Sequence, residues 1–191
     1  MTKHLILASS SPRRQELLHQ VKIPFTIRKP NVDESQVKTT DPFEKVKQLA
    51  IRKGHNLQLE NKDEVLLSSD TVVSYKKDIF EKPKNKEEAY QMISTLSGNI
   101  HEVFTAVMIR SSDDEFIFVE STNVEFWPLR EEEINWYIST NEPYDKAGAY
   151  GIQQTGAMFV KQVIGDYYNV VGLPISRVVR ELRRFSVYPE A

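Results

Sequence analysis

The chain has 191 residues, with 25 basic and 27 acidic side chains and a formal net charge of -2 at pH 7. Hydrophobic residues make up 40% and charged residues 27%, a balance typical of one globular domain and unlike that of a disordered chain. The absence of cysteine excludes disulfides, thiolate catalysis and cysteine-based zinc sites, and a pI of about 6.1 argues against binding to a nucleic-acid polymer. No apolar run reaches the roughly 18–20 residues of a membrane span, and no signal-peptide pattern opens the chain, so we expect a cytoplasmic protein without a membrane partner.

Apolar strand-like runs alternate with helical patterns along the chain, which predicts an α/β fold. Two helix starts carry strong capping signals, Asp41 with Glu44 and Asn85 with Glu88. In chain order, the patterns predict strands over 4–8, 25–28, 65–75, 101–110, 115–127 and 157–164, and helices over 12–21, 41–59, 85–98, 131–139 and 174–185.

The segment from Ser9 to Arg14 joins the first predicted strand to the first predicted helix. Helix N-termini carry partial positive charge and free N–H groups, so they attract anions and disfavour cations. Arg13 and Arg14 at such an end are explained if a phosphate or carboxylate binds between them and the nearby serine hydroxyls. The alternative is that Ser11 only caps the helix while both arginines are solvated. The chain contains no G-x-x-x-x-G-K-[ST] phosphate loop.

Two charged residues interrupt apolar patterns. Lys53 falls on the apolar stripe of the predicted helix 41–59, and Asp70 lies within the apolar strand 65–75. A buried charge is costly unless it is paired, so Lys53 either extends to water or reaches an anion in a cleft. Asp70 is a candidate metal ligand or general base, because open α/β sheets carry their chemistry near strand ends. The alternative for Asp70 is a structural acid held by hydrogen bonds.

The remaining polar signals are weaker. Glu34 lies in a polar loop and Lys82 in a turn before a helix, so each alone is typical of the surface. The segment 145–153 combines two glycines with Gln153, whose amide can pair with a base edge, although a tight structural turn would have the same composition. The four histidines lack metal-ligand spacing and are expected to be structural or exposed, and Glu131 to Glu133 are expected to form a solvated helix face.

Taken together, these segments follow the motif order of a known family. The matching segments are L-A-S-x-S-P-R-R-x-E-L-L at 7–18, D-E at 33–34, S-D-T at 69–71, K-P at 82–83, L-S-G with His101 at 96–101, E-P-x-D-K-A-G-A-Y-G-I-Q at 142–153 and G-D-Y-Y-N-V-V-G-L-P at 165–174. The sequence resembles the Maf family of nucleoside triphosphate pyrophosphatases, once linked to septum formation. The resemblance covers nearly the whole chain, and its long motifs are highly specific.

The resemblance implies a single two-lobed α/β domain over residues 1–191, similar to inosine triphosphate pyrophosphatases, with a central mixed sheet and flanking helices around a cleft. The implied reaction converts a nucleoside triphosphate and water to a monophosphate and pyrophosphate, with a divalent cation as cofactor. Oxygen ligands without histidine or cysteine suit a hard metal, Mg²⁺ or Mn²⁺. The implied catalytic residues are Asp70, Lys53, Lys82 and Glu34, with Asp70 and Glu34 also as metal ligands, and the implied phosphate-binding residues are Ser9, Ser11, Arg13 and Arg14.

Within the family, the combination of Arg13, Thr71 and Gln153 resembles the subgroup that acts on dTTP and UTP. The alternatives are a pyrophosphatase for purine or methylated-guanine nucleotides and a non-catalytic nucleotide-binding regulator of cell division. The sequence departs from the family pattern at Gln154 and Thr155, where many relatives carry glycine just after the glutamine. The expected partners are a nucleoside triphosphate and, since such proteins are often dimeric, a second copy of the chain.

Overall fold

The computed structural model describes residues 2–191, which form a seven-stranded mixed sheet flanked by helices. The strands are β1 (His4–Ala8), β2 (Phe25–Ile27), β3 (Glu64–Tyr75), β4 (Asp78–Phe80), β5 (Ile100–Arg110), β6 (Glu115–Phe126) and β7 (Val160–Ile164). The helices are α1 (Pro12–Gln20), α2 (Pro42–Asn56), α3 (Lys86–Leu96), α4 (Glu131–Ile138), α5 (Tyr167–Val171) and α6 (Ile175–Leu182), and 3-10 turns cover Glu34–Gln36, Pro143–Asp145, Ala147–Ala149, Thr155–Phe159 and Arg183–Phe185.

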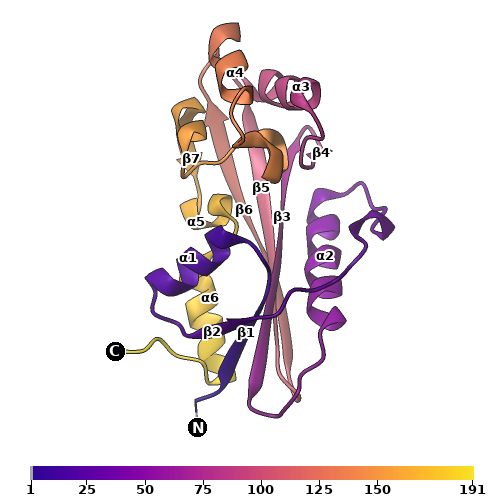
Figure 1. The fold of residues 1–191 in the computed structure, drawn as a ribbon, viewed down its shortest axis with the longest axis vertical. Helices are drawn as coiled ribbons and strands as arrows, with labels where there is room; N and C mark the ends of the chain where they lie inside the picture. The colour runs from indigo at the N-terminus through magenta and orange to yellow at the C-terminus, as the bar shows by residue number, and fades with distance from the viewer. Residues whose placement is uncertain (1) are drawn as a thin grey trace.

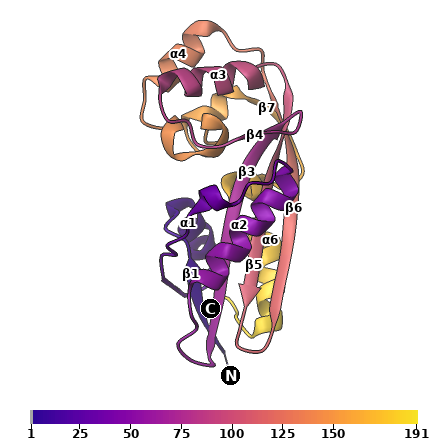
Figure 2. The same cartoon turned by 90° about the vertical axis from the view of Figure 1, so that its right-hand side faces the viewer.

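The sheet has the strand order β2-β1-β3-β5-β6-β7, with β4 paired to the far end of β3. β1 lies parallel to both of its neighbours, whereas β5, β6 and β7 continue the sheet in antiparallel fashion. The long strands β3, β5 and β6 run the length of the molecule (Figure 1). One lobe gathers α1, α2 and α6 around their lower part, and the other places α3 and α4 near their upper end (Figure 2).

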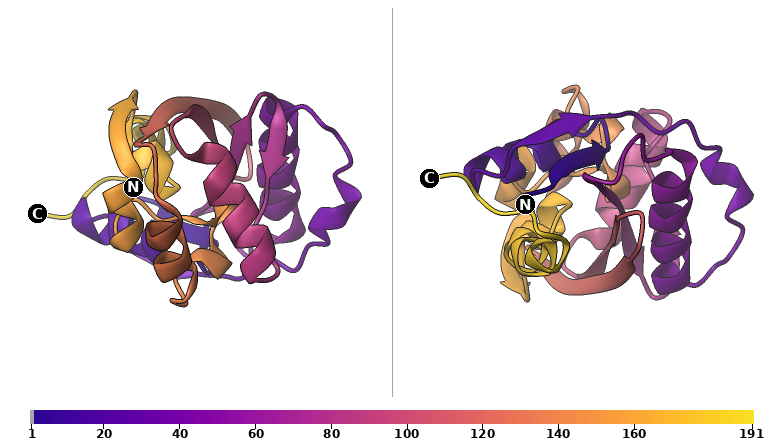
Figure 3. Two further views of the ribbon diagram at one scale, coloured as in Figure 1. Left: turned by 90° about the horizontal axis from the view of Figure 1, so that it is seen from above. Right: turned by 90° about the horizontal axis from the view of Figure 1, so that it is seen from below.

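In the lower lobe, helices cover both faces of the sheet. Figure 3 shows α2 on one side of the sheet and α6 on the other. The α2 side buries Val46 and Ala50 of the helix against Val72, Phe104 and Ala106 of the sheet. The larger apolar cluster lies on the opposite face and continues into the upper lobe. Because both faces are covered, a charged side chain on a central strand needs a partner within the protein.

The β1 side of β3 is paired only at its two ends. Ala8, the last residue of β1, pairs with Ser68, and β4 begins to pair with β3 at Val73. Between these positions, residues 69–72 pair with β5 alone among residues 2–191. The sheet is therefore open beside Asp70, at the end of β1, where α/β proteins commonly bind ligands.

The helix predicted over 41–59 ends earlier than expected, at Asn56. Its start is as predicted, since the Asp41 side chain accepts a hydrogen bond from the backbone N–H of Glu44 at 2.8 Å. At the other end, the guanidinium of Arg110 donates to the carbonyl oxygens of Gly54 and Leu57. These bonds satisfy carbonyl groups that further helix would otherwise pair, so the chain leaves the helix at Leu57.

The strand predicted over 157–164 is wrong in its first part. Residues Thr155–Phe159 form a 3-10 turn, and β7 begins only at Val160. The backbone N–H groups of Thr155 and Gly156 donate to the carboxylate of Glu142, which lies outside the segment, and this long-range contact replaces strand pairing. The short elements β4 and α5 were not predicted.

The other predicted helices and the hairpin of 101–110 with 115–127 are confirmed, within a few residues at their ends. The four histidines and the first turn of α4 also lie as expected, with His101 buried and Glu131 and Glu132 exposed. From Thr2 to Ala191, no helix has both the length and the apolar character needed to cross a membrane.

His101 on β5 is the one buried histidine among the described residues, with 1% of its surface exposed. Its Nε2 shares a hydrogen bond of 2.8 Å with the hydroxyl of Tyr150, and its ring packs edge-on against Phe126. Burial lowers the pKa of His101 from 6.5 to about 4. The folded protein therefore favours the neutral ring.

We predict that this histidine makes the fold sensitive to mild acid. As the pH falls from 6.5 towards 4, the unfolded chain gains a proton that the folded chain does not, so the free energy of unfolding falls by up to about 3 kcal/mol. His101→Gln should remove this part of the pH dependence, measured by urea unfolding at pH 7.5 and pH 4.5. His19→Gln, at an exposed histidine, is the control and should behave like the parent protein. Equal pH dependence in both variants would contradict the prediction.

Candidate active site

A cavity of about 1070 Å³ lies at the opening of the sheet, between the two lobes. It contains every site residue that the sequence indicated. Those residues are Ser9, Ser11, Arg13, Arg14, Glu34, Lys53, Asp70, Thr71, Lys82 and Gln153. They come from the loop between β1 and α1, from α1, the 3-10 turn Glu34–Gln36, α2, β3, the turn after β4 and the upper-lobe segment after α4, so only the folded chain brings them together.

Asp70 is 8% exposed and forms an ion pair with Lys53 of α2. The Lys53 ammonium also lies 2.8 Å from Oε1 of Glu34, so one cation bridges two carboxylates. Burial raises the pKa of Asp70 above its ordinary value, against the opposing effects of Lys53 and Arg14. Burial also acts to raise the pKa of Glu34, but the hydrogen bond and charge of Lys53 outweigh it and lower that pKa overall. Of the two alternatives for Lys53, the structure therefore has the lysine reaching an anion in the cleft.

This ion pair depends on how closely α2 approaches the sheet. A Cβ on Gly54 would lie 2.7 Å from both the Met108 sulfur and the Ser68 hydroxyl oxygen, so any larger residue would force these buried side chains to shift. The Ser68 hydroxyl donates to the Ala50 carbonyl at 2.7 Å, which fastens the helix to β3 at the same level. The neighbouring residue Lys53 is thereby held over Asp70.

Arg14 is held by the protein on three sides. Its Nε donates to the Gly172 carbonyl at 2.8 Å, its Nη1 to the Ser9 hydroxyl at 3.2 Å and its Nη2 to the Thr71 hydroxyl at 3.2 Å. Thr71 in turn shares a hydrogen bond of 2.9 Å with Thr105 on β5. Because successive strand residues point to opposite faces, Thr71 and Asp70 lie on opposite faces of β3. Arg14 therefore holds Ser9 and Thr71 in place as well as contributing a positive charge.

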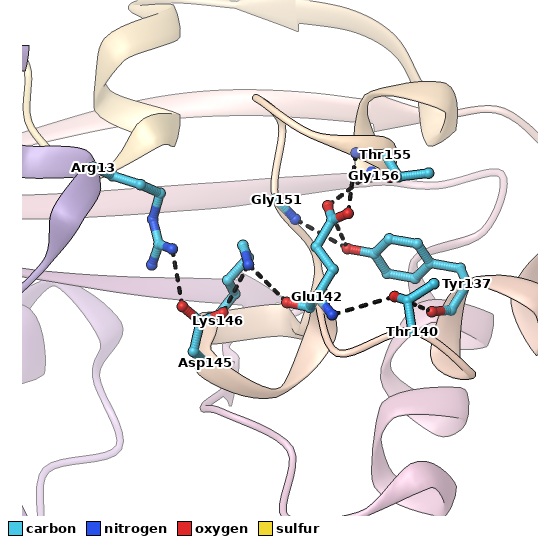
Figure 4. A network of polar contacts seen from close by, with 9 residues as sticks. All are labelled: Arg13, Tyr137, Thr140, Glu142, Asp145, Lys146, Gly151, Thr155 and Gly156. Atoms are coloured by element: carbon cyan, nitrogen blue, oxygen red, sulfur yellow. Dashed lines mark hydrogen bonds and ion pairs between the residues drawn. The ribbon is translucent and has the colours of Figure 1, made fainter. Parts of the chain in front are cut away.

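Arg13 reaches across the cavity to the upper lobe. Its Nη1 lies 3.1 Å from Oδ2 of Asp145, whose other oxygen accepts a hydrogen bond from Lys146 at 2.7 Å (Figure 4). Burial acts to raise the pKa of Asp145, but the bonds from Lys146 and Arg13 outweigh it and lower that pKa overall. Sequence reasoning assigned no charge partner to Arg13. The only signal for one was the D-K dipeptide within the 142–153 motif.

Lys82 and Ser11 line the cavity without a recorded side-chain partner among residues 2–191. Ser11 stands at the N-cap of α1, but its side chain makes no capping hydrogen bond, so the alternative of a simple cap is not supported. Lys82 is close enough to help lower the pKa of Glu34. The turn that carries Lys82 is fixed to α2 by an ion pair of 2.5 Å between Glu81 and Lys45.

The cavity offers few side chains that could coordinate a metal ion. Within the described part of the chain, no group of three or more histidine, cysteine, aspartate or glutamate side chains is arranged to hold a metal ion. Asp70 and Glu34, joined by Lys53, are two carboxylates facing one point of the cavity. Two carboxylates supplemented by water and substrate phosphates are typical of Mg²⁺ sites in proteins that bind nucleotides. These two carboxylates are oxygen donors of the kind that a hard divalent cation takes, but they do not by themselves complete a site.

The structure is similar to that of a HAM1 protein from Coxiella burnetii, with a TM-score of 0.55 and 13% sequence identity over 96% of this chain and 100% of that one. At that identity, the similarity defines the fold alone. The expected α/β fold, with a central mixed sheet and flanking helices, is confirmed.

Sequence comparison then identifies the family. The profile described as Maf-like protein matches residues 4–185, and the chain belongs to that family. A dTTP/UTP pyrophosphatase of Bacillus cereus (strain G9842) is 48% identical over 185 residues, which are 97% of this chain and 97% of the relative. A dTTP/UTP pyrophosphatase of Bacillus anthracis (strain CDC 684 / NRRL 3495) shows the same identity and coverage.

We predict that Lys53→Met destabilises the fold. The substitution leaves Asp70 buried beside Glu34 without the cation that bridges them, and removing one member of a buried ion pair costs about 3 kcal/mol. Lys47→Met, on the same helix, is the matched control, because Lys47 has no recorded ion pair or hydrogen bond among the described residues. Its expected effect is below about 0.5 kcal/mol. Chemical denaturation measures both, and equal stability of the two variants would contradict the role of Lys53.

Proposed function

We propose that this protein hydrolyses dTTP and UTP to the nucleoside monophosphate and pyrophosphate. The observation that carries the proposal is the buried Asp70 carboxylate, which shares one cavity with the cationic side chains of Lys53, Arg13, Arg14 and Lys82. A cavity with several cations suits a polyanion such as a triphosphate, and a pure binding protein has no need of a central carboxylate facing it. The relatives named dTTP/UTP pyrophosphatase support the same substrate class.

The cations and the start of α1 would bind the triphosphate. Arg13 can bind phosphate oxygens through paired N–H donors, and Lys82, which lines the same cavity, adds a point charge. The first turn of α1, whose N-cap makes no side-chain hydrogen bond, offers the backbone N–H groups of Arg13 and Arg14 to the same anion. These groups would offset the charge that grows on pyrophosphate as it leaves the α-phosphorus, and such fixed electrostatic interactions usually supply the largest catalytic contribution.

Asp70 would act at the point of attack. A water molecule must approach the α-phosphorus in line with the departing pyrophosphate, and a carboxylate beside it can accept its proton. Burial favours that role, since it raises the pKa of Asp70, while Lys53 holds the carboxylate in a fixed orientation. The alternative role for Asp70 is that of a metal ligand, which uses the same oxygens.

A divalent cation fits the same place. Asp70 and Glu34 would hold it, and Mg²⁺ or Mn²⁺ suits their oxygen ligands. When bound, the ion would polarise phosphoryl oxygens and neutralise part of the triphosphate charge. Lys53, which bridges both carboxylates, would keep them positioned.

Gln153 would recognise the base. It is exposed within the cavity, and among residues 2–191 its side chain has no recorded hydrogen-bond partner. Its amide carries one acceptor and two donors, which match the N3–H and carbonyl groups of uracil and thymine. Thr71 bonds to Arg14 and Thr105, so we propose that Thr71 affects specificity through Arg14.

We further propose that residues 1–191 act as one domain, because β3, β5 and β6 are shared by both lobes. The cytoplasmic location and the homodimer stay predictions.

The direct test is the yield of pyrophosphate from dTTP, UTP, CTP, GTP, ITP and 7-methyl-GTP, each with and without magnesium. We expect metal-dependent pyrophosphate release that is fastest with dTTP and UTP. Preference for a purine or methylated-guanine nucleotide would replace the proposed substrate. Binding without turnover would favour a regulator, and release of orthophosphate would indicate a different phosphoryl-transfer reaction.

We predict that Asp70→Asn lowers turnover of UTP at least about a hundredfold, the usual loss when a positioned acid or base is removed. The fold should persist, because the amide has the same shape and Lys53 keeps Glu34 as a partner. Asp113→Asn, in the exposed loop between β5 and β6, is the control and should leave turnover unchanged. Steady-state pyrophosphate release measures the effect, and near-parental turnover in Asp70→Asn would refute the assignment.

We predict that Gln153→Glu lowers kcat/KM for dTTP and UTP by on the order of tenfold to a hundredfold relative to CTP, because a carboxylate cannot donate to a base carbonyl. Gln154→Glu is the matched control, since it adds the same charge at the next exposed position of the cavity wall. The comparison separates base recognition from general repulsion of the triphosphate. Identical ratios among the nucleotides in both variants would rule out base recognition by Gln153.

A further inference from the structure

Gln153, the residue proposed to recognise the base, lies in a segment that is not part of the β-sheet. Gly151 to Gln154 line the cavity, but the nearest strand, β7, begins only at Val160. Gln153 itself has no recorded side-chain bond to the rest of the chain between Thr2 and Ala191. The position of its amide therefore depends on what fixes the backbone on either side.

The side chain of Glu142 fixes the backbone after Gln153. Its Oε2 accepts a hydrogen bond from the Thr155 N–H at 3.1 Å, and its Oε1 accepts one from the Gly156 N–H at 3.0 Å (Figure 4). A carboxylate that accepts two adjacent backbone N–H groups is a strong, charge-assisted anchor. The segment 151–156 therefore closes onto Glu142, a residue of the chain between α4 and the turn Pro143–Asp145.

Tyr137 of α4 fixes the backbone before Gln153. Its hydroxyl donates to Oε1 of Glu142 at 3.1 Å and accepts a hydrogen bond from the Gly151 N–H at 3.3 Å. Burial, followed by the charge of Glu142, raises the pKa of Tyr137 above its ordinary value, so the hydroxyl keeps its proton. One carboxylate and one phenol thus hold both ends of the segment.

The anchor is itself held rigidly. The Glu142 N–H donates to the Thr140 hydroxyl at 3.2 Å, and the Glu142 carbonyl accepts a bond from the Lys146 ammonium at 2.7 Å. A Cβ on Gly156 would lie 2.7 Å from the Gly151 carbonyl oxygen, so the two ends of the segment pack directly against each other. A shift of the Glu142 carboxylate would therefore be passed to the residues between those ends.

Glu142 and Tyr137 do not line the cavity, although Gly151 to Gln154 do. Their side chains act on the cavity through the segment that they hold. We propose that Glu142, together with Tyr137, is a positioning residue that sets base discrimination by fixing the amide of Gln153. This inference rests on the proposed function, and it adds the residues that make the specificity group rigid.

The test compares Glu142→Gln with the parent protein. The amide can keep one acceptor, but its NH₂ group then faces a backbone N–H or the Tyr137 hydroxyl, so at least one anchoring bond is lost. We expect the ratio of kcat/KM for UTP to that for CTP to fall by about tenfold, because a specificity group displaced by about 1 Å loses much of its effect. The kcat for UTP should change less than about threefold, since the contacts of Asp70 are untouched. Glu132→Gln, an exposed residue on α4, is the control and should keep the parental ratio.

A second background shows whether the effect passes through Gln153. In Gln153→Ala protein, which has no amide to position, Glu142→Gln should leave the UTP to CTP ratio unchanged. A general structural role would instead lower kcat on all nucleotides alike, or would lower the ratio equally in both backgrounds, and either result overturns the inference. If Glu142→Gln does not fold, Tyr137→Phe carries the same test, because it keeps the packed ring and removes only the hydroxyl.

The same measurements separate this inference from the proposed function. Parent protein that does not favour UTP and dTTP overturns the proposed function and this inference with it. Parent protein that discriminates, together with a Glu142→Gln variant that discriminates equally well, overturns the positioning role alone.

Discussion

The ion pair between Lys53 and Asp70 is the interaction on which the site depends. A carboxylate within an apolar central strand costs several kcal/mol unless a cation or hydrogen bonds compensate it. Lys53 supplies that compensation from α2, which approaches β3 closely at the neighbouring Gly54. The same ammonium also holds Glu34, so the interaction that makes a buried acid tolerable gathers two carboxylates at one point of the cavity.

The two faces of β3 present different groups to the cavity. Asp70 points to the α2 side, with the carboxylates and Lys53, whereas Thr71 points to the side of α1, where Arg14 joins it to Ser9. The upper lobe contributes a third wall, with Gln153, and Arg13 contacts it through Asp145. The residues proposed for chemistry, for anion binding and for base recognition thereby lie on separate elements.

Local signals in the sequence predicted most of the helices and strands, and they singled out several of the polar residues that line the cavity. The caps at Asp41 and Asn85 fixed two helix starts, because a cap depends on only a few neighbouring residues. Outcomes that depend on distant contacts were not predictable from the chain. The early end of α2 depends on Arg110 of β5, and the 3-10 turn that replaced a predicted strand depends on Glu142.

The same distinction applies to the site. The sequence placed Lys53 and Asp70 out of their apolar patterns, but it could not decide whether the lysine meets an anion or water, since that depends on packing between α2 and β3. It grouped Arg13 with Arg14, yet the first contacts Asp145 and the second holds Ser9 and Thr71. Without the resemblance to a family, Glu34 and Lys82 would have been taken as surface residues.

The strands β3, β5 and β6 run without interruption through both lobes, and this limits how the lobes can move relative to each other. Hinge motion normally needs a flexible connection between two bodies, but here β3, β5 and β6 pass from one lobe to the other as a continuous hydrogen-bonded ribbon. Bending the three strands would strain the hydrogen bonds between them. The stiffness of these strands therefore limits how far the cavity can widen or narrow. On the proposed function, discrimination between nucleotides would then have to come from short segments at the edge of the cavity, such as the one that carries Gln153.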